Sequence, residues 1–410
     1  MLTRRSTVRA GLAALALTLT TSAFVPAAFA QDGAPIKVGE INSYTRMAAF
    51  TEPYRKGWEL ALEEINAAGG VKGRPLEVLS RDDTGDPATA IRIADELVNR
   101  EDVVLIFGTF LSNIGLAVSD FANQSQTLFI ASEPLTDALI WSSGNRYTYR
   151  LRPGTSMQAS MLAEEAAKTD AVKWATIAPN YAYGTDAVEA FKTALKKLKP
   201  EVEFVEEQWP TLFKIDAGST VRALEQAKPD GIYNVTFGGD LAKFVREGSL
   251  RGLFDDRVVV SLLSGEPEYL EPLGDEAPEG WIVTGYPPLA IDTPEHDAFL
   301  KAYEEKWGEA PKTGSIVGYN SMMTIKALLE AAPSLETDAL LETMEGLRIE
   351  ESPTGPFLYR PVDNQATMGA YVGKTGLVDG KPTMVDWRYA AGEDYLPSEA
   401  DALGLRPDSQ

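Results

Sequence analysis

The chain has 410 residues, of which 60 are acidic and 38 basic, and it contains one histidine and no cysteine. The formal net charge of −22 argues against binding to nucleic acid or to an anionic membrane, because both need basic surface. The absence of cysteine excludes disulfides and thiolate chemistry, and the length predicts roughly two or three domains.

Residues 1–30 have the pattern of a cleaved signal peptide. A basic start with three arginines precedes an apolar core at residues 10–20 and a small-x-small sequence at residues 28–30. The apolar core is too short to span a membrane. The paired arginines also half-match a twin-arginine signal, so the general secretory route and the twin-arginine route both stay open. By either route we expect an exported, periplasmic protein.

From residue 36 onward, short apolar runs alternate with stretches of helical periodicity. The polar segment at residues 42–51 is expected to be a loop, and the helix after it should end at Gly69-Gly70. Asp86 followed by Pro87 predicts the start of the next helix. Strands are predicted at residues 36–41, 76–81, 103–107, 127–131 and 147–151.

The alternation then restarts after residues 152–154. Further strands are predicted at residues 174–178, 202–205, 231–236, 257–261 and 281–285. Helices are predicted around residues 157–167, 186–198, 241–247, 294–307, 314–332 and 337–347, with terminal strands and loops from residue 353. Strands spaced regularly between amphipathic helices predict an α/β fold with parallel sheets, here as two doubly wound lobes.

Polar loops follow two of the predicted strands in the first lobe. One loop covers residues 109–113 and the other residues 132–137. Open parallel sheets bind ligands at the carboxyl ends of their strands. We therefore expect these two loops to form half of a small-molecule site.

The usual catalytic and metal-binding patterns are missing. There is no G-x-S-x-G elbow and no G-x-x-x-x-G-K-[ST] phosphate loop, and His296 is expected at an exposed helix start. Asp82, Asp83 and Asp86 fit a turn and a helix cap better than a metal site. We expect no catalytic residue, metal or cofactor. A hydrolase that uses two distant carboxylates stays open as a less favoured alternative.

Two sequence runs resemble a known family. EEINAAGGVKGR at residues 63–74 and DDTGDP at residues 82–87 closely resemble the amino-acid-type (Leu/Ile/Val-binding-like) periplasmic binding proteins of ABC importers. Other landmarks agree in order and spacing, at residues 108–112, 181–184, 278–280 and 353–356. The resemblance covers nearly the whole mature chain, and its motifs indicate the family but not the ligand.

The resemblance implies a type I periplasmic binding fold. Such a protein has two Rossmann-like, doubly wound lobes joined by three crossover segments, with the ligand in the cleft between them. Lobe one would comprise residues 36–153 plus 285–349, and lobe two residues 154–284 plus 350–390. Residues 391–410 would form a C-terminal tail.

The resemblance also implies a function. The protein would capture a small ligand by hinge closure and deliver it to the membrane permease subunits of an ABC importer, without a cofactor and as a monomer. A periplasmic sensor that docks on a membrane receptor would have the same fold, and the sequence does not separate these two roles.

Several ligand contacts in lobe one follow from the resemblance. Ser112 takes the place of the serine that holds a ligand carboxylate, and Thr136 matches a threonine of the next loop if one residue is inserted. Pro134 and Leu135 would offer backbone groups. Ser112 and Asn113 lead into a helix N-terminus, which favours an anion. The alternative is that Ser112 or Asn113 only caps that helix.

Lobe two would supply the opposite wall. Tyr183 matches an aromatic residue that faces the ligand, and Phe237 and Glu266 lie near the remaining contacts of the family. The alternatives are a packed turn residue for Tyr183 and a solvated loop charge for Glu266.

At two positions the residue differs from the one that the amino-acid receptors of the family have. Thr155 stands where these receptors have an aspartate that holds the α-ammonium group. Arg46 lies in the first loop beside Tyr44 and Phe50, unless it is a surface arginine that points away. Two ligand classes therefore stay open. One is an amino acid, and the other is an aromatic or aliphatic acid without an α-ammonium group.

Overall fold

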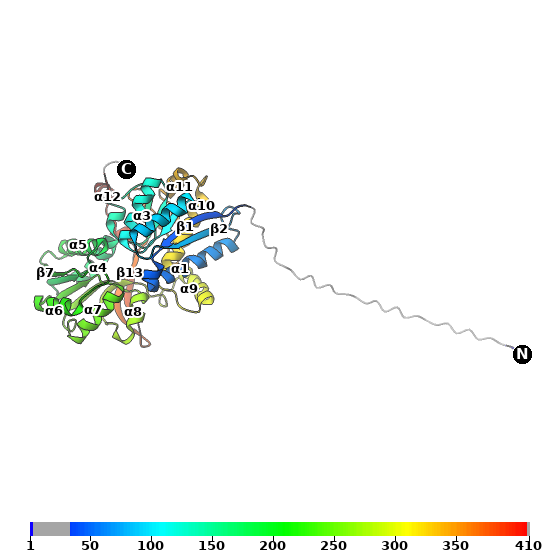
Figure 1. The fold of residues 1–410 in the computed structure, drawn as a ribbon. Helices are drawn as coiled ribbons and strands as arrows, with labels where there is room; N and C mark the ends of the chain where they lie inside the picture. Colours follow the sequence, from blue (N-terminus) through cyan, green and yellow to red (C-terminus); the bar gives the residue numbers. More distant parts are fainter. Residues whose placement is uncertain (3–32, 408–410) are drawn as a thin grey trace.

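The computed structural model describes residues 1–2 and 33–407, so nearly all of the predicted signal peptide lies outside the described residues. Two sheets, each covered by helices, form the two lobes in Figure 1. The sheet of lobe one has the order β2-β1-β3-β4-β5, and every neighbouring pair is parallel. Its strands are β1 (Ile36–Asn42), β2 (Leu76–Asp82), β3 (Ile106–Gly108), β4 (Phe129–Ala131) and β5 (Thr148–Arg150).

The sheet of lobe two has the order β14-β13-β10-β9-β8-β6-β7, in which β13 is antiparallel to both of its neighbours and all other neighbouring pairs are parallel. Its strands are β6 (Lys173–Ile177), β7 (Glu203–Gln208), β8 (Gly231–Asn234), β9 (Val258–Gly265), β10 (Ile282–Gly285), β13 (Ala370–Val378) and β14 (Lys381–Ala390). A third, two-stranded sheet pairs β11 (Arg348–Ile349) with β12 (Phe357–Leu358).

The helices lie between these strands in sequence. Those of the first half are α1 (Tyr44–Ala67), α2 (Pro87–Asn99), α3 (Ser112–Ser125), α4 (Thr155–Ala167), α5 (Ala182–Leu198) and α6 (Ala217–Ala227). Those of the second half are α7 (Gly238–Leu250), α8 (Pro267–Leu273), α9 (Pro294–Trp307), α10 (Thr313–Ala331), α11 (Thr337–Met344) and α12 (Glu399–Leu405). Among the described residues, no helix combines the length and the apolar character that a membrane span requires.

The chain passes between the lobes three times. It leaves lobe one after β5, returns after β10 to form α9, α10 and α11, and crosses again to form β13 and β14. In Figure 1 the blue elements and the yellow α9 and α10 accordingly share one lobe, and the green elements and the orange β13 share the other. The predicted fold class, two doubly wound lobes with three crossovers, is confirmed. The residue limits given for each lobe stay a prediction.

Local sequence signals explain several element ends. The carboxylate of Asp86 accepts a hydrogen bond from the Thr89 N–H at 2.8 Å and so caps α2, which begins at Pro87. Gly69 and Gly70 follow the end of α1 with φ of +107° and +71°, a backbone region that residues with a side chain rarely adopt. Both predictions from sequence are confirmed.

The predicted loop at residues 42–51 is wrong, because α1 already begins at Tyr44. The helix continues through a kink at Met47 and contains Pro53. Proline lowers helix propensity, but Phe50 and Tyr54 are buried against the lobe, so tertiary packing outweighs the local preference.

The expected exposure of His296 is also wrong. Its side chain is buried, and its Nε2 lies 2.6 Å from the Tyr286 hydroxyl. The described part of the C-terminal tail contains a short 3₁₀ turn, Gly392–Tyr395, and α12. Arg406 ties the tail to lobe one, since its guanidinium donates to the Asn145 carbonyl at 3.1 Å.

Candidate ligand-binding site between the lobes

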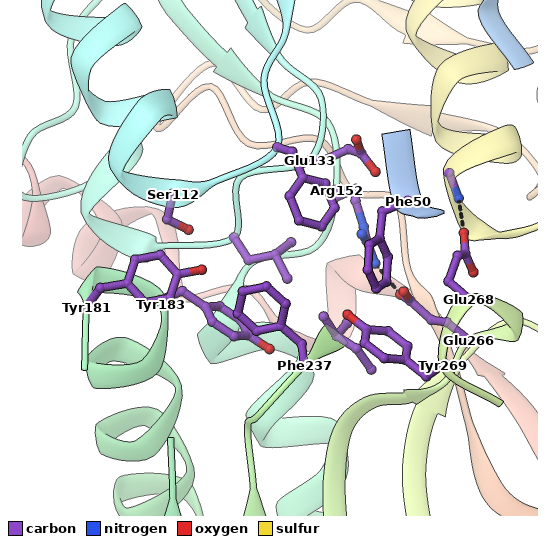
Figure 2. A pocket seen from close by; sticks show the side chains of 14 residues that line it. Phe50, Ser112, Glu133, Arg152, Tyr181, Tyr183, Phe237, Glu266, Glu268 and Tyr269 are labelled. Carbon is purple, nitrogen blue, oxygen red and sulfur yellow. Dashed lines mark hydrogen bonds and ion pairs between the residues drawn. The ribbon is translucent and has the colours of Figure 1, made fainter. Parts of the chain in front are cut away.

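A cavity lies between the lobes, at the carboxyl ends of β3 and β4. Both lobes line it, and Figure 2 shows the side chains that point into it. In the described conformation it encloses only about 30 Å³, so the lobes are nearly closed on each other. The lining residues are Phe50, Phe110, Ser112, Glu133, Leu135, Arg152, Tyr181, Tyr183, Phe237, Leu263, Glu266, Glu268, Tyr269 and Gly314.

Ser112 connects the two polar loops that follow β3 and β4. It is the first residue of α3, whose N-cap is Leu111, so neither Ser112 nor Asn113 is the cap of this helix. The Ser112 hydroxyl oxygen accepts a hydrogen bond from the Thr136 N–H at 3.3 Å. Its own hydrogen remains available as a donor to a group in the cavity. The first N–H groups of α3 add a partial positive charge at the same place.

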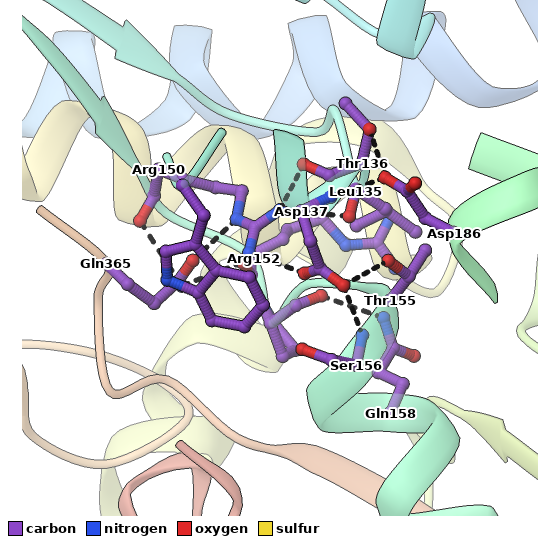
Figure 3. A network of polar contacts seen from close by, with 12 residues as sticks. Leu135, Thr136, Asp137, Arg150, Arg152, Thr155, Ser156, Gln158, Asp186 and Gln365 are labelled. Atoms are coloured by element: carbon purple, nitrogen blue, oxygen red, sulfur yellow. Dashed lines mark hydrogen bonds and ion pairs between the residues drawn. The ribbon is translucent and has the colours of Figure 1, made fainter. Parts of the chain in front are cut away.

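A buried arginine fixes the shape of the second loop, as Figure 3 shows. The Arg150 guanidinium donates to the carbonyls of Leu135 and Thr136 at 2.9 and 2.6 Å, and it pairs with Asp137 at 3.2 Å. It also donates to the Gln365 side chain at 2.5 Å. These bonds satisfy carbonyls that would otherwise be buried without partners, and they hold the loop that presents Leu135 to the cavity.

Aromatic rings form most of the cavity wall. Phe50 lies between Phe110 of its own lobe and Tyr269 of lobe two, with ring centroids 5.4 and 5.0 Å apart. Tyr183 and Phe237 meet edge to face at 5.8 Å. Rings packed at such distances suit a flat or apolar ligand body.

One end of the cavity concentrates charge. Arg152 pairs with Glu266 at 2.5 Å, and both side chains are buried. Glu133 and Glu268 are buried close by, and one Glu268 oxygen accepts from the Gly314 N–H at 2.8 Å. The alternative that Glu266 is a solvated loop charge is therefore wrong. Three carboxylates face one guanidinium at this end.

Burial controls the protonation of these carboxyl groups. It raises the pKa of Glu266 to about 7, although Arg152 opposes the shift. Burial raises the pKa of Glu133 well above its ordinary value, again against the effect of Arg152. The pKa of Glu268 is raised by the same cause. The acidic end therefore holds protons more tightly than solvated glutamates do.

Two polar atoms of the lining residues have no protein partner. The Tyr183 hydroxyl and one carboxylate oxygen of Glu268 are both buried without a hydrogen bond. Buried polar groups are normally paired, so these two atoms can take polar groups of a ligand. Burial also raises the pKa of Tyr183 well above its ordinary value, which keeps its hydroxyl a neutral donor.

The structure brings five of the eleven site residues predicted from sequence to this cavity. These are Ser112, Leu135, Tyr183, Phe237 and Glu266.

The other predicted residues do not line this cavity. The Thr136 hydroxyl donates to the Asp186 carboxylate in lobe two, and the Thr155 hydroxyl donates to Asp137 at 2.7 Å. The guanidinium of Arg46 lies 4.5 Å above the Phe213 ring, outside this cavity.

Three further predicted residues also lie outside the cavity lining. The Tyr44 hydroxyl accepts from the Trp58 indole at 3.3 Å. Asn113 and Pro134 lie beside the lining residues of their loops, and Pro134 packs over Gly115 of α3.

The described residues contain no group of His, Cys, Asp or Glu side chains that could hold a metal ion. The acidic run after β2 has structural roles instead. Asp83 accepts from the Ser43 hydroxyl and the Gly85 N–H at 2.7 Å each, and Asp82 accepts from the Thr84 N–H at 2.9 Å. The predicted turn and helix cap are confirmed.

The comparison with known families agrees with this geometry. Residues 35–381 match the sequence profile of a family described as "Periplasmic binding protein". The chain belongs to the periplasmic binding protein family. The resemblance found in the sequence motifs is therefore confirmed, and the family is one of binding proteins, not of enzymes.

Curated relatives of this periplasmic binding protein carry related names. The chain is 27% identical over 339 residues to Leu/Ile/Val-binding protein homolog 7 of Brucella suis biovar 1 (strain 1330). The alignment covers 78% of this chain and 83% of the relative. The chain is also 25% identical over 361 residues to Leu/Ile/Val-binding protein homolog 8 of the same strain. That alignment covers 83% of this chain and 86% of the relative.

Solved structures share the fold of this periplasmic binding protein. One is a solute binding protein of an ABC transporter from Rhodopseudomonas palustris BisB5 in complex with 3,4-dihydroxy benzoic acid (TM-score 0.78, 24% identity, 87% of this chain and 98% of the other). Another is a leucine-, isoleucine-, valine-, threonine- and alanine-binding protein from Brucella ovis in a closed conformation (TM-score 0.78, 18% identity, 88% and 97%).

Sequence reasoning missed several lining residues of this periplasmic binding protein. Arg152, Glu133 and Glu268 are charged residues near strand ends, and local sequence does not tell a buried charge from a solvated one. Tyr181 and Tyr269 could have been found as aromatic residues in loops or first helical turns after predicted strands, whereas Tyr183 was identified from the family resemblance.

Proposed function

We propose that this periplasmic binding protein captures a small organic acid and delivers it to the permease subunits of an ABC importer. The observation that carries the proposal is the position of Ser112. Its hydroxyl and the N-terminus of α3 face a ring-lined cavity that both lobes build. A ligand held there contacts both lobes, so it favours the closed form over the open one.

The polar end at Ser112 suits a carboxylate. The Ser112 hydroxyl accepts from the Thr136 N–H and can donate its own hydrogen to the ligand. Helix N-termini bind anions through free N–H groups and the helix dipole. No basic side chain is needed at this end.

The chemistry of the remaining lining matches an aromatic acid best, and such a ligand needs a wider cleft than the about 30 Å³ of the described conformation. Six rings surround the cavity, from Phe50, Phe110, Tyr181, Tyr183, Phe237 and Tyr269. The 3,4-dihydroxy benzoic acid complex of one structural relative is consistent with such a ligand. A ring hydroxyl would give a donor to the acidic end at Glu266 and Glu268.

An amino acid is the second candidate, and the acidic end is the observation that favours it. Three buried carboxylates face one guanidinium there, so a ligand ammonium group would balance charge. The names of the curated relatives and the Brucella ovis structure point to the same class. Thr155, which bonds to Asp137, does not supply the carboxylate that the amino-acid receptors use.

We further propose that the protein acts as a monomer in the periplasm after signal cleavage, since a single chain forms both walls of the cavity. A sensor role would use the same cavity. Deletion of the protein separates the two roles, because loss of a receptor abolishes uptake of its ligand, whereas loss of a sensor leaves uptake intact.

A thermal-shift screen of the mature protein against aromatic acids, aliphatic acids and amino acids tests the proposal. A ligand at ~100 times its dissociation constant should stabilise the protein by about 2.7 kcal/mol. We expect aromatic monocarboxylates to raise the melting temperature more than their amides do. If amides and acids act equally, the carboxylate assignment is wrong.

A further inference from the structure

A second, larger cavity adjoins the site described above. It lies between α1 of lobe one and α7 and α8 of lobe two, and it encloses about 440 Å³, compared with about 30 Å³ for the first. Its lining is mostly apolar or small: Met47, Ala48, Ala49, Phe50, Phe213, Gly238, Gly239, Leu241, Ala242, Tyr269, Pro272 and Leu273, with Arg46 and Glu268 as the charged members.

The wall between the two cavities consists of side chains. Phe50, Glu268 and Tyr269 line both cavities. The rings of Phe50 and Tyr269 come from opposite lobes and lie 5.0 Å apart, centroid to centroid. Rotation of either ring, or a small separation of the lobes, would join the cavities without any change in the sheets.

Glu268 marks the junction as a place for a ligand. One of its carboxylate oxygens accepts from the Gly314 N–H, but the other is buried and has no partner. Buried polar atoms are normally hydrogen-bonded, so this oxygen can accept a hydrogen bond from a ligand. A hydroxyl or amide N–H of a ligand that passes the junction would satisfy it.

Arg46 and Phe213 line the second cavity but not the first, and they make a contact between the lobes. The Arg46 guanidinium of lobe one lies 4.5 Å above the Phe213 ring of lobe two. Ser112, in contrast, lies at the opposite end of the first cavity from Glu268, as Figure 2 shows. The two cavities therefore follow one another from Ser112, past Phe50 and Tyr269, to Arg46.

We propose that the second cavity is an extension of the ligand site that receives the distal part of an elongated organic acid. The carboxylate lies at Ser112, and the apolar body passes between Phe50 and Tyr269 towards Arg46. This inference rests on the proposed function, because it takes Ser112 as the anchor of the carboxylate. The ligands expected from this inference are organic acids that are longer than benzoate.

A homologous series of phenyl-substituted acids tests the length preference. The mature protein is titrated by calorimetry with benzoate, phenylacetate, 3-phenylpropanoate, 4-phenylbutanoate and 5-phenylpentanoate. We expect affinity to rise by about fourfold for each added methylene group that enters the second cavity. If benzoate binds and longer acids bind no better, the extension is wrong while the proposed function stands. If no acid binds, the proposed function itself fails.

A cavity-filling variant gives the second test. Ala242 lies on α7 in the second cavity and outside the first, so Ala242→Trp should remove the added affinity of 5-phenylpentanoate, a loss of about tenfold or more, and leave benzoate affinity unchanged. The matched control is Ala339→Trp, at a similarly half-buried helix position on α11. Equal effects of Ala242→Trp on the two acids, or no effect on either, would overturn the proposal.

Discussion

At the scale of single residues, Ser112 was predictable and its charged neighbours were not. The rule that ligands bind at the carboxyl ends of parallel strands leads directly to Ser112, because it follows β3 in the sequence. Arg152 and Glu266 are 114 positions apart, and only the fold shows that they form a buried pair. Patterns in local sequence carry no information on such a contact.

Replacement of Ser112 tests the carboxylate anchor. A hydrogen bond to a charged group contributes about 1.5–3 kcal/mol, so Ser112→Ala should weaken binding of a carboxylate ligand by roughly tenfold to a hundredfold in calorimetry. Ser125→Ala is the matched control, since Ser125 ends the same helix and its hydroxyl bonds only within lobe one. Unchanged affinity of Ser112→Ala would remove the carboxylate assignment.

The buried glutamates predict proton uptake on binding. We expect separation of the lobes to expose Glu266 to solvent and return its pKa towards 4.5, whereas burial in the described conformation raises it to about 7. The closed form thus binds more protons between about pH 4.5 and 7, and affinity for a carboxylate ligand should fall as the pH rises through this window.

Calorimetry at pH 6 in two buffers with different ionisation enthalpies measures this uptake. Glu133→Gln should reduce it, because burial also raises the pKa of Glu133. The exposed Glu305→Gln serves as a control that should change nothing. Identical heats in the two buffers would show that the acidic end does not take up protons. A ligand with an ammonium group should take up fewer protons, since its charge favours the ionised carboxylates.

At the scale of elements, the positions of most strands and helices along the chain follow from the alternation in the sequence, but the start of α1 does not. The segment at residues 42–51 shortly precedes a proline and resembles a loop, yet α1 begins at Tyr44 and the backbone of Phe50 already packs closely on Gly314 of α10. The packing of α1 on α10 depends on glycine. A Cβ atom on Gly57 would lie 1.9 Å from the Ser315 carbonyl oxygen, and one on Gly318 would lie 2.1 Å from that of Tyr54.

This close approach predicts the effect of Gly57→Ala. Helix propensity alone would favour alanine by about 1 kcal/mol, but the clash with backbone should destabilise the protein by about 1–3 kcal/mol. Thermal or urea unfolding measures the change. Gly404→Ala on α12 is the control, because no atom lies within 4 Å of its added Cβ. A Gly57→Ala protein as stable as the parent would mean that α1 and α10 do not pack this closely.

At the scale of the whole molecule, the periodicity of the sequence predicted two series of strands, one after the other. Only the family motifs predicted that each lobe is built from separate segments of the chain. The lobes contact each other at both sides of the site. The Asp186 carboxylate of lobe two accepts from the Asp137 N–H of lobe one at 2.9 Å, and Glu268 accepts from Gly314 at 2.8 Å. These contacts between the lobes stabilise the closed form. A ligand that contacts both lobes in the cleft stabilises it further.

The distance between the lobes, with and without ligand, tests the central claim most directly. Because the chain has no cysteine, spin labels can be attached only at the introduced positions Glu52→Cys on α1 and Lys243→Cys on α7. Pulsed electron spin resonance then gives the distance distribution between the lobes. We predict a longer-distance population without ligand that a saturating carboxylate ligand converts to the short distance of the closed form. An unchanged distribution at a ligand concentration that calorimetry shows to be saturating would contradict capture by lobe closure.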